Sequence, residues 1–117
     1  MSVADRLRKM GLELPPPFAA GDYVPAVHAG DLVFVSGSGP QLPDGRFVTD
    51  RVKRIVKLLG FVNSAPGFNQ QPAVIDGASR LLISLFGGRG RHARSAVGMA
   101  ELPFNIAVEL EMVVQVA

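Results

Sequence analysis

The chain of 117 residues contains no cysteine. This absence excludes a disulfide framework, a zinc site built on cysteine ligands and a thiol nucleophile. Long apolar runs are missing too, since none approaches the ~18 residues that a membrane-spanning helix needs. The charged first ten residues lack the hydrophobic segment of a signal peptide. We therefore expect a cytoplasmic protein that does not cross a membrane.

The chain also lacks a large excess of charge of one sign. Lys and Arg together number 12 and Asp and Glu number 10, which gives a formal net charge of +2. Proteins that bind nucleic acid usually gather a larger basic excess on one face. The charge balance therefore indicates no particular macromolecular partner.

The remaining composition predicts one ordinary folded domain. Hydrophobic residues make up 48% of the chain, which is too many for a disordered protein. A chain of this length buries roughly two-thirds of its unfolded surface, so a core can form without disulfides or metals. We assign residues 1–20 to an N-terminal helix and extended arm, and residues 21–117 to the core of the domain.

Two segments near the N-terminus carry local signals. Ser2 and Asp5 predict an approximate capping box at the start of a short helix, and Gly11 suits its end. Residues 23–37 predict a β-hairpin whose loop contains Gly30. The chain thus begins with a helix and then enters a sheet.

The stretch at residues 50–63 has two interpretations. Val52, Ile55 and Leu59 recur at helical spacing, which favours a basic amphipathic helix. The β-branched residues and the run "IVKLLGFV" favour a buried strand instead. Periodicity alone does not distinguish the two.

The second half of the chain predicts one long helix followed by two strands. Residues 72–88 form the helix, which ends at the Gly87–Gly88 pair. Residues 93–102 and 107–117 alternate in the manner of strands. These elements predict an α+β domain with one sheet and helix packed on it. The apolar stripe expected on the helix consists of Val74, Ala78, Leu81, Leu82 and Leu85.

The stretch "GGRGRHARS" (87–95) gathers three arginines and a histidine. Arg94 stands at a strand start, and its face then carries only small residues, which leaves room above the sheet. An arginine there can hold a planar carboxylate through two parallel hydrogen bonds. On spacing alone, an arginine paired with an acid at the sheet edge is the favoured alternative. Arg89 and Arg91 are interpreted as solvated loop residues.

Other polar residues give weaker signals. Glu109 and Glu111 lie on one strand face about 7 Å apart, which suits paired acid and base work, although a solvent-facing polar stripe is the simpler interpretation. His28 and His92 lack metal-ligand spacing, so we expect no metal site. The stretch "SGSGP" (36–40) lacks phosphate-binding patterns and predicts a turn or exposed backbone groups for a small ligand.

Three motifs together resemble the Rid family, which is also called YjgF or endoribonuclease L-PSP. They are "YVPAV…GDLVFVSG", "RHARSAVGMAELP" and "VELEMVVQVA", and the likeness runs from about Gly21 to the C-terminus. The motifs "VIDGASRLL" and "GRGRHARSAVG" resemble a branch distinct from the RidA type. The resemblance implies a chorismate-mutase-like α+β fold with one mixed sheet, helices on one face, and a homotrimer with ligand clefts between subunits.

The resemblance also implies roles for individual residues. Arg94 matches the arginine that binds the substrate carboxylate, and Glu109 matches the glutamate that positions the attacking water. Tyr23 matches a pocket tyrosine, and Ser36 and Gly37 match the serine and glycine at a strand end. The implied reaction is hydrolysis of a reactive enamine or imine, such as 2-aminoacrylate, to a 2-keto acid and ammonia, with no cofactor.

The chain departs from the RidA type in ways that affect the substrate pocket and the fold. Ala96 stands where those members have cysteine, and Ser79 falls near their helix asparagine, so we expect a pocket of different shape. Between Asp50 and Arg51 the family normally has a strand and a long helix of roughly thirty residues. We favour omission of a segment over true shortening, because half of a sheet face would otherwise be uncovered. The resemblance also favours a strand at residues 54–62.

Three functions follow as hypotheses. The first is a hydrolytic deaminase of enamines or imines, and the second is a non-catalytic trimer that binds small carboxylate metabolites. The third, endoribonuclease activity, is the weakest, because no basic stripe with interleaved aromatic residues is visible in the sequence. We expect a small carboxylate-bearing substrate as partner, and neither nucleic acid nor a membrane.

Overall fold

The computed structural model describes residues 1–13, 23–38 and 52–117. Within these ranges the predicted N-terminal helix, hairpin, long helix and two final strands are all present. In chain order the elements are α1 (Val3–Lys9), β1 (Ala26–Ala29), β2 (Leu32–Ser38), β3 (Val52–Asn63), α2 (Gln71–Phe86), the 3-10 helix η2 (Gly87–Gly90), β4 (Ala93–Met99), the 3-10 helix η3 (Pro103–Asn105) and β5 (Val108–Val116).

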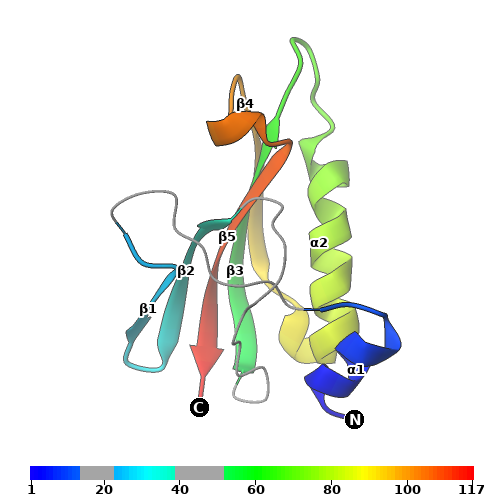
Figure 1. Ribbon diagram of the computed structural model, residues 1–117, viewed down its shortest axis with the longest axis vertical. Helices are drawn as coiled ribbons and strands as arrows, with labels where there is room; N and C mark the ends of the chain where they lie inside the picture. Colours follow the sequence, from blue (N-terminus) through cyan, green and yellow to red (C-terminus); the bar gives the residue numbers. More distant parts are fainter. Residues whose placement is uncertain (14–22, 39–51) are drawn as a thin grey trace.

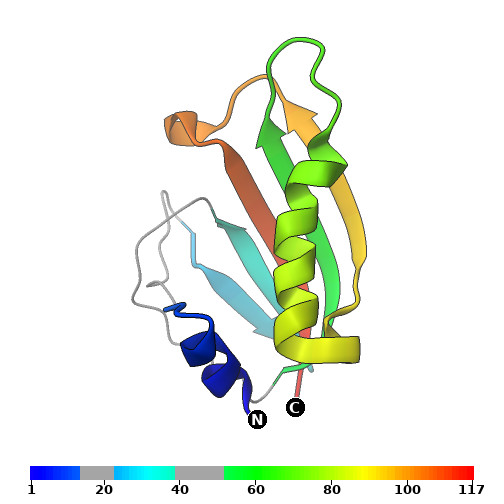
Figure 2. The ribbon, with the colours of Figure 1, turned by 90° about the vertical axis from the view of Figure 1, so that its right-hand side faces the viewer.

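The described strands form one mixed sheet in the order β1-β2-β5-β3-β4. β3 and β4 are parallel and are connected through α2, whereas the other neighbouring strands are antiparallel. Figures 1 and 2 show that α2 lies along one face of the sheet, with α1 near its lower end. The prediction of an α+β fold with a single mixed sheet and helices on one face is confirmed. We call the opposite face, which carries no described helix, the open face.

Residues 52–63 form β3 in the interior of the sheet, so the strand interpretation of this stretch is correct. β3 pairs with β5 on one side and with β4 on the other. Ile55, Leu58 and Val62 are buried beneath the helices, and Leu58 is 0% exposed. A strand with neighbours on both sides and a helix above it needs an almost continuous apolar run, which explains the pattern in the sequence.

The buried stripe of α2 differs from the predicted one. The sequence predicts Val74 and Leu81 in the core, but they are 40% and 38% exposed. The side chains of α2 that the core receives are Ile75, Ala78, Leu82, Leu85 and Phe86. Apolar residues cover a wide arc of this helix, so periodicity does not fix which part faces the sheet. Packing against β3 decides the rotation of the helix.

α1 closes the lower end of the core. Ser2 and Asp5 form the predicted capping box, with Ser2 Oγ accepting from Asp5 N–H at 3.1 Å and Asp5 Oδ2 accepting from Ser2 N–H at 3.2 Å. Hydrogen bonds from the Ser2 side chain and backbone hold the pKa of Asp5 below its usual value. Arg6 Nη1 donates to the Leu85 carbonyl at 2.7 Å, which ties α1 to the end of α2.

α2 approaches β3 closely at Gly60. A Cβ on Gly60 would lie 2.5 Å from Ile75 Cδ1 and 2.6 Å from its Cγ1. Ile75 is itself 1% exposed, so its side chain has little room to move away. Gly77, the glycine inside α2, has no such neighbour, because a Cβ there would meet no described atom within 4 Å.

Some predictions fall on residues that the structure does not describe. The extended arm at residues 14–20 and the junction between Asp50 and Arg51 belong to these. The omission of a strand and a helix at that junction therefore stays a prediction. Across the three described ranges, no helix has the length and apolar character of a membrane span.

We expect Gly60→Ala to destabilise the fold. The added methyl group overlaps the buried Ile75 side chain, and overpacking of a filled core costs about 1–3 kcal/mol. The matched control, Gly77→Ala, places the same group in open space within α2 and is expected to stabilise by up to about 1 kcal/mol. Urea unfolding measures both free energies. Equal stabilities of the two variants would contradict the close approach of α2 to β3.

Candidate functional site

Arg94 lies on the helix-covered face of the edge strand β4, opposite Leu58 of β3. Its Nη1 donates to Asp76 Oδ1 at 2.7 Å and to Ser79 Oγ at 3.1 Å. Its Nη2 donates to the Pro72 carbonyl at 3.4 Å. All three acceptors belong to α2, so the helix holds the guanidinium at the edge of the sheet.

Asp76 is the acidic partner of Arg94. The pair is partly sheltered, because the side chain of Arg94 is 22% exposed and that of Asp76 is 42% exposed. Arg80 approaches the other Asp76 oxygen only to 3.9 Å and is largely exposed. The structure thus contains the arginine–acid pair that spacing alone favours over a ligand-binding arginine. A guanidinium has five N–H donors, so the three bonds to described residues leave two donors for a further acceptor.

His92 and Ser79 extend this arrangement. Ser79 Oγ lies 2.9 Å from His92 Nε2, and His92 Nδ1 is hydrogen-bonded to the Gly90 carbonyl. His92 precedes Arg94 by two residues in extended chain, so the two side chains point to the same side. We call Asp76, Ser79, His92 and Arg94 the Arg94 cluster.

The glycine-rich turn η2 places His92 beside α2. Gly87 has a φ of 64°, the left-handed conformation that ends the helix. Gly90 is buried, and a Cβ there would overlap the Leu82 carbonyl group of α2. A residue without a side chain is therefore needed where the chain folds back against the helix. The "GGRG" stretch returns the chain along α2 so that β4 begins next to Ser79.

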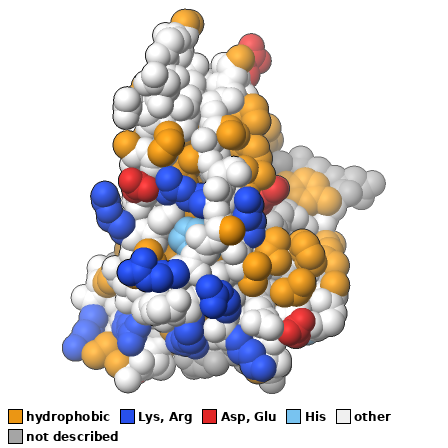
Figure 3. All heavy atoms as spheres, turned by 180° about the vertical axis from the view of Figure 1, so that it is seen from behind, with side chains coloured by type: hydrophobic (Ala, Val, Ile, Leu, Met, Phe, Trp, Pro, Cys, Tyr) orange, Lys and Arg blue, Asp and Glu red, His pale blue; other side chains and the backbone are white. Residues whose placement is uncertain are grey.

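The other two arginines of this stretch have different environments. Arg89 Nη1 donates to the Val52 carbonyl at 2.7 Å, and its guanidinium lies 5.8 Å from the centre of the Phe86 ring. The interpretation of Arg89 as a merely solvated loop residue is therefore wrong, because Arg89 ties the turn to the start of β3. Arg91 is exposed, as predicted. Figure 3 shows Lys and Arg side chains gathered over the lower part of the face seen from behind.

The small residues of β4 do not leave open space above the sheet. Ala96 shares the face of Arg94 and packs against the buried cluster that includes Leu58 and Ile75. A Cβ on Gly98 would lie 2.5 Å from Gln71 Nε2. The room that the sequence predicted beside Arg94 is thus occupied by α2, which needs small residues beneath it.

Glu109 belongs to a second group of predicted site residues, around the end of β2. Its Oε2 lies 2.8 Å from the position of a Cβ on Gly37, so the carboxylate rests against the backbone there. Ser36 Oγ donates to the Val24 carbonyl at 2.6 Å. Tyr23, just before β1, is 48% exposed. We call Tyr23, Ser36, Gly37 and Glu109 the Glu109 group.

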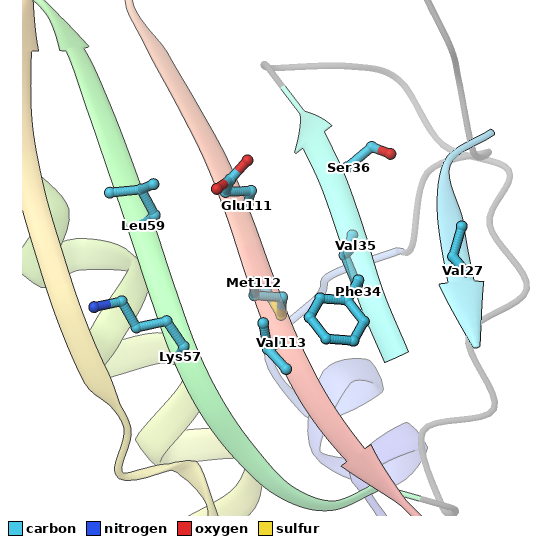
Figure 4. A pocket seen from close by; sticks show the side chains of 9 residues that line it. All are labelled: Val27, Phe34, Val35, Ser36, Lys57, Leu59, Glu111, Met112 and Val113. Atoms are coloured by element: carbon cyan, nitrogen blue, oxygen red, sulfur yellow. The ribbon is translucent and has the colours of Figure 1, made fainter. Parts of the chain in front are cut away.

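A hollow of about 330 Å³ opens on the open face. Figure 4 shows Val27 and Phe34 on one side of it and Lys57 and Leu59 on the other, with Glu111 between them. Lys57 Nζ donates to a serine hydroxyl of β4 at 3.5 Å. The lining is mainly apolar, and both Val27 and Phe34 are exposed. Ser36 of the Glu109 group also borders the hollow.

The Arg94 cluster and the Glu109 group do not meet within one chain. Arg94 lies on the helix-covered face of β4, whereas Glu109 lies on the open face of β5, and β3 separates the two strands. Of the predicted site residues, the structure therefore brings Arg94, Ser79 and Ala96 together. Among the residues that the structure describes, no three His, Asp or Glu side chains are placed to hold a metal ion.

Sequence reasoning missed the roles of Asp76 and His92 in the cluster. Asp76 precedes Ser79 by three residues on a helix, which puts both on one side. His92 precedes Arg94 by two residues on extended chain, which again gives a shared side. These spacings were readable in the sequence, but the register between α2 and β4 was not.

Comparison with known proteins gives two curated relatives of note, and no family model matches the chain. Over 67 residues the chain is 58% identical to protein TCP17 of Trypanosoma cruzi, a match that covers 56% of this chain and 42% of that protein. The match thus spans less than half the length of TCP17. Over 118 residues the chain is 30% identical to a 2-iminobutanoate/2-iminopropanoate deaminase of Dermatophagoides farinae, with 84% of this chain and 88% of that protein covered.

Solved structures extend the likeness over the whole chain. A protein of unknown function from Agrobacterium tumefaciens is 33% identical, with a TM-score of 0.85 over 98% of this chain and 93% of that one. A protein from Shewanella oneidensis that is described as a candidate endoribonuclease is 26% identical, with a TM-score of 0.89 over 99% and 100% of the two chains. Both share the arrangement of sheet and helices found here.

A double-mutant cycle tests the pairing of Arg94 with Asp76. We expect the Arg94→Ala and Asp76→Ala changes to be coupled by about 1 kcal/mol, at the upper end for exposed pairs, because the 2.7 Å contact is partly sheltered. The control cycle, Arg80→Ala with Asp76→Ala, is expected to give a coupling near zero, since that contact is long and exposed. Denaturant unfolding measures both cycles. Similar couplings in the two cycles would overturn the assignment of Asp76 to Arg94.

Proposed function

Because the chain belongs to the Rid family, also called YjgF or endoribonuclease L-PSP, we propose that it hydrolyses reactive enamines or imines to 2-keto acids and ammonia. The relative from Dermatophagoides farinae bears the name of an imine deaminase. The substrate we propose is a small 2-imino or 2-enamino acid of the 2-aminoacrylate kind. The reaction requires water and no cofactor.

The observation that carries this proposal is the geometry of Arg94. Its guanidinium is fixed by acceptors on α2 and retains two N–H donors beyond its bonds to described residues. A planar guanidinium matches the two oxygens of a carboxylate. Arg94 would therefore hold the carboxylate of the substrate and fix the position of the adjacent C=N carbon.

The chemical step adds water to that carbon and releases ammonia, so that a C=O bond replaces the C=N bond. A carboxylate that accepts a proton from the water makes the water a better nucleophile. We assign this role to Glu109. An enamine substrate first takes up a proton on carbon and gives one up from nitrogen to become the imine, after which the same hydrolysis follows.

We further propose a homotrimer in which the site lies between subunits. The separation of Arg94 from Glu109 within one chain supports this, because the Arg94 cluster of one subunit and the Glu109 group of another can then face each other. The exposed apolar lining of the open-face hollow, with Phe34 47% exposed, is suited to contact with another copy. Tyr23, Ser36 and Gly37 would then line the cleft together with Ser79, whereas Ala96 packs beneath α2 and would act only by leaving room for the helix.

Release of ammonia from enzymatically generated 2-iminopropanoate tests the enzymatic role. We expect Arg94→Ala to lower kcat/KM by about 10- to 150-fold, the loss that follows from removing a charged hydrogen-bonding partner worth about 1.5–3 kcal/mol. The control is Arg91→Ala, which removes an exposed arginine three residues away and is expected to keep the rate of the wild type. Rates of wild type and Arg94→Ala that both equal the uncatalysed rate would rule out the deaminase.

Glu109→Gln tests the proposed base. The amide keeps the shape of the side chain but accepts a proton poorly, so we expect kcat to fall about 10²-fold or more. Glu101→Gln, at an exposed position outside the strands, is the matched control. A kcat that is unchanged in Glu109→Gln would remove Glu109 from the mechanism.

The assembly is tested by mass in solution. We expect wild type to sediment at three times the 12.4 kDa chain mass, and Phe34→Asp to shift the population towards monomer. Leu81→Asp places the same charge on an exposed apolar site of α2 and is expected to leave the trimer intact. A wild-type monomer at micromolar concentration would contradict the proposed site between subunits.

A second candidate is a non-catalytic binder of small carboxylate metabolites. The ion pair with Asp76 favours it, because that pair partly neutralises Arg94 and holds its guanidinium against α2. Binding of a 2-keto acid without turnover of any imine would support this candidate. RNA binding that weakens with salt and survives Arg94→Ala would instead favour endoribonuclease activity of this chain, the activity named for the Shewanella protein.

A further inference from the structure

We propose that His92 is a positioning residue that acts through Ser79 on the Arg94 guanidinium, and this inference rests on the proposed function. His92 is not one of the residues that the family resemblance assigns to the site. In the structure it is two hydrogen bonds away from the arginine, through Ser79 Oγ. The proposal assigns a function to the histidine of the "GGRGRHARS" stretch.

The carbonyl of Gly90 fixes the tautomer of His92. A carbonyl oxygen only accepts hydrogen bonds, so the contact between His92 Nδ1 and this oxygen requires a proton on Nδ1. In the neutral ring Nε2 then carries a lone pair and no proton. Nε2 must accept its hydrogen bond, and the partner at 2.9 Å is the Ser79 hydroxyl.

The acceptor on His92 in turn orients the Ser79 hydroxyl. Since the Ser79 hydroxyl donates its hydrogen bond to His92 Nε2, its oxygen lone pairs can accept from Arg94 Nη1 at 3.1 Å. The same Nη1 donates to Asp76 Oδ1 at 2.7 Å. With Nη1 donating to both acceptors and Nη2 donating to the Pro72 carbonyl at 3.4 Å, rotation of the guanidinium is restricted.

Without His92 the hydroxyl has another partner close at hand. A serine inside a helix readily donates to the backbone carbonyl four residues earlier, which here belongs to Ile75. That rotation changes the direction of its lone pairs relative to Arg94. His92 competes with the backbone for the proton of Ser79 and so keeps the oxygen directed at Arg94.

The fold places His92 firmly enough for this role. The buried Gly90 lets η2 pack against the Leu82 carbonyl of α2, and β4 starts directly afterwards with Ala93 paired to Lys57. The histidine is therefore held between a turn on the helix and a paired strand. A rigid support of this kind is what a residue that orients a binding group requires.

The expected consequence is a loss of substrate binding with little change in the chemical step. Disorder in the guanidinium weakens its hold on the carboxylate, whereas Glu109 and the water are unaffected. His92→Phe keeps an aromatic ring at this position but has neither ring nitrogen. We expect this variant to raise KM about 10-fold, with kcat within 2-fold of wild type. A factor of ten corresponds to about 1.4 kcal/mol. His92→Gln, whose Oε1 can accept from Ser79, is expected to restore most of the affinity.

Two measurements on the full chain test the proposal. Nitrogen-15 NMR of the imidazoles reports the tautomer directly, and His28→Ala identifies which signals belong to His92. We expect the neutral ring of His92 to carry its proton on Nδ1. A neutral ring with its proton on Nε2 would overturn the proposed link through Ser79. This result does not depend on any enzymatic activity.

Kinetics of His92→Phe, His92→Gln and Ser79→Ala test the role, with thermal unfolding as the check on folding. His28→Phe, at an exposed position in β1, is the matched control and is expected to keep both KM and Tm. A folded His92→Phe and a folded Ser79→Ala that both keep the KM of the wild type would overturn the positioning role. Absence of turnover in the wild type would instead sink the proposed function, while the tautomer still decides whether the link through Ser79 exists.

Discussion

The close approach of α2 to β3 is the contact on which the rest of the structure depends. Ile75 fills the space above Gly60 and is buried beside Leu58. This contact fixes the distance of α2 from the sheet and the rotation of α2 about its axis. With Ile75 directed inward, the next residue, Asp76, and the residue three further on, Ser79, face the edge strand β4. The ion pair and the hydrogen bonds of Arg94 follow from that rotation.

The arrangement around Arg94 has an electrostatic consequence. Asp76 offsets part of the charge of the arginine, and Ser79 and the Pro72 carbonyl hold its remaining geometry, so the guanidinium is oriented before any ligand arrives. Orientation of this kind lowers the entropy cost of binding a planar carboxylate. The site that we propose is incomplete within one chain, because Glu109 lies on the other face of the sheet. The proposed homotrimer would bring the two faces together between neighbouring copies.

Local elements were readable from the sequence where the signal is short in range. The capping box of Ser2 and Asp5, the Gly87 helix end and the alternation of β5 all appear as predicted. β3 was ambiguous because a strand buried beneath a helix needs apolar residues almost throughout, and such a run also fits a helix. The rotation of α2 was missed for a related reason, since its apolar arc is wider than the sheet contact.

The candidate site was harder to predict because it depends on contacts between distant segments. Sequence reasoning singled out Arg94, and the family resemblance added Glu109, but neither gave the acid that binds the arginine or the face on which each lies. The small residues of β4 were interpreted as space for a ligand, whereas they accommodate α2. The structural role of Arg89 likewise becomes apparent only from its contacts with Val52 and Phe86.

A crystal structure of the chain with a bound 2-keto acid tests the central claim most directly. We expect the carboxylate of the ligand to lie within hydrogen-bonding distance of the Arg94 guanidinium, about 2.7–2.9 Å. We also expect Glu109 of a neighbouring copy to face the keto carbon. A ligand bound away from Arg94, with the arginine still engaged only by α2, would contradict the account.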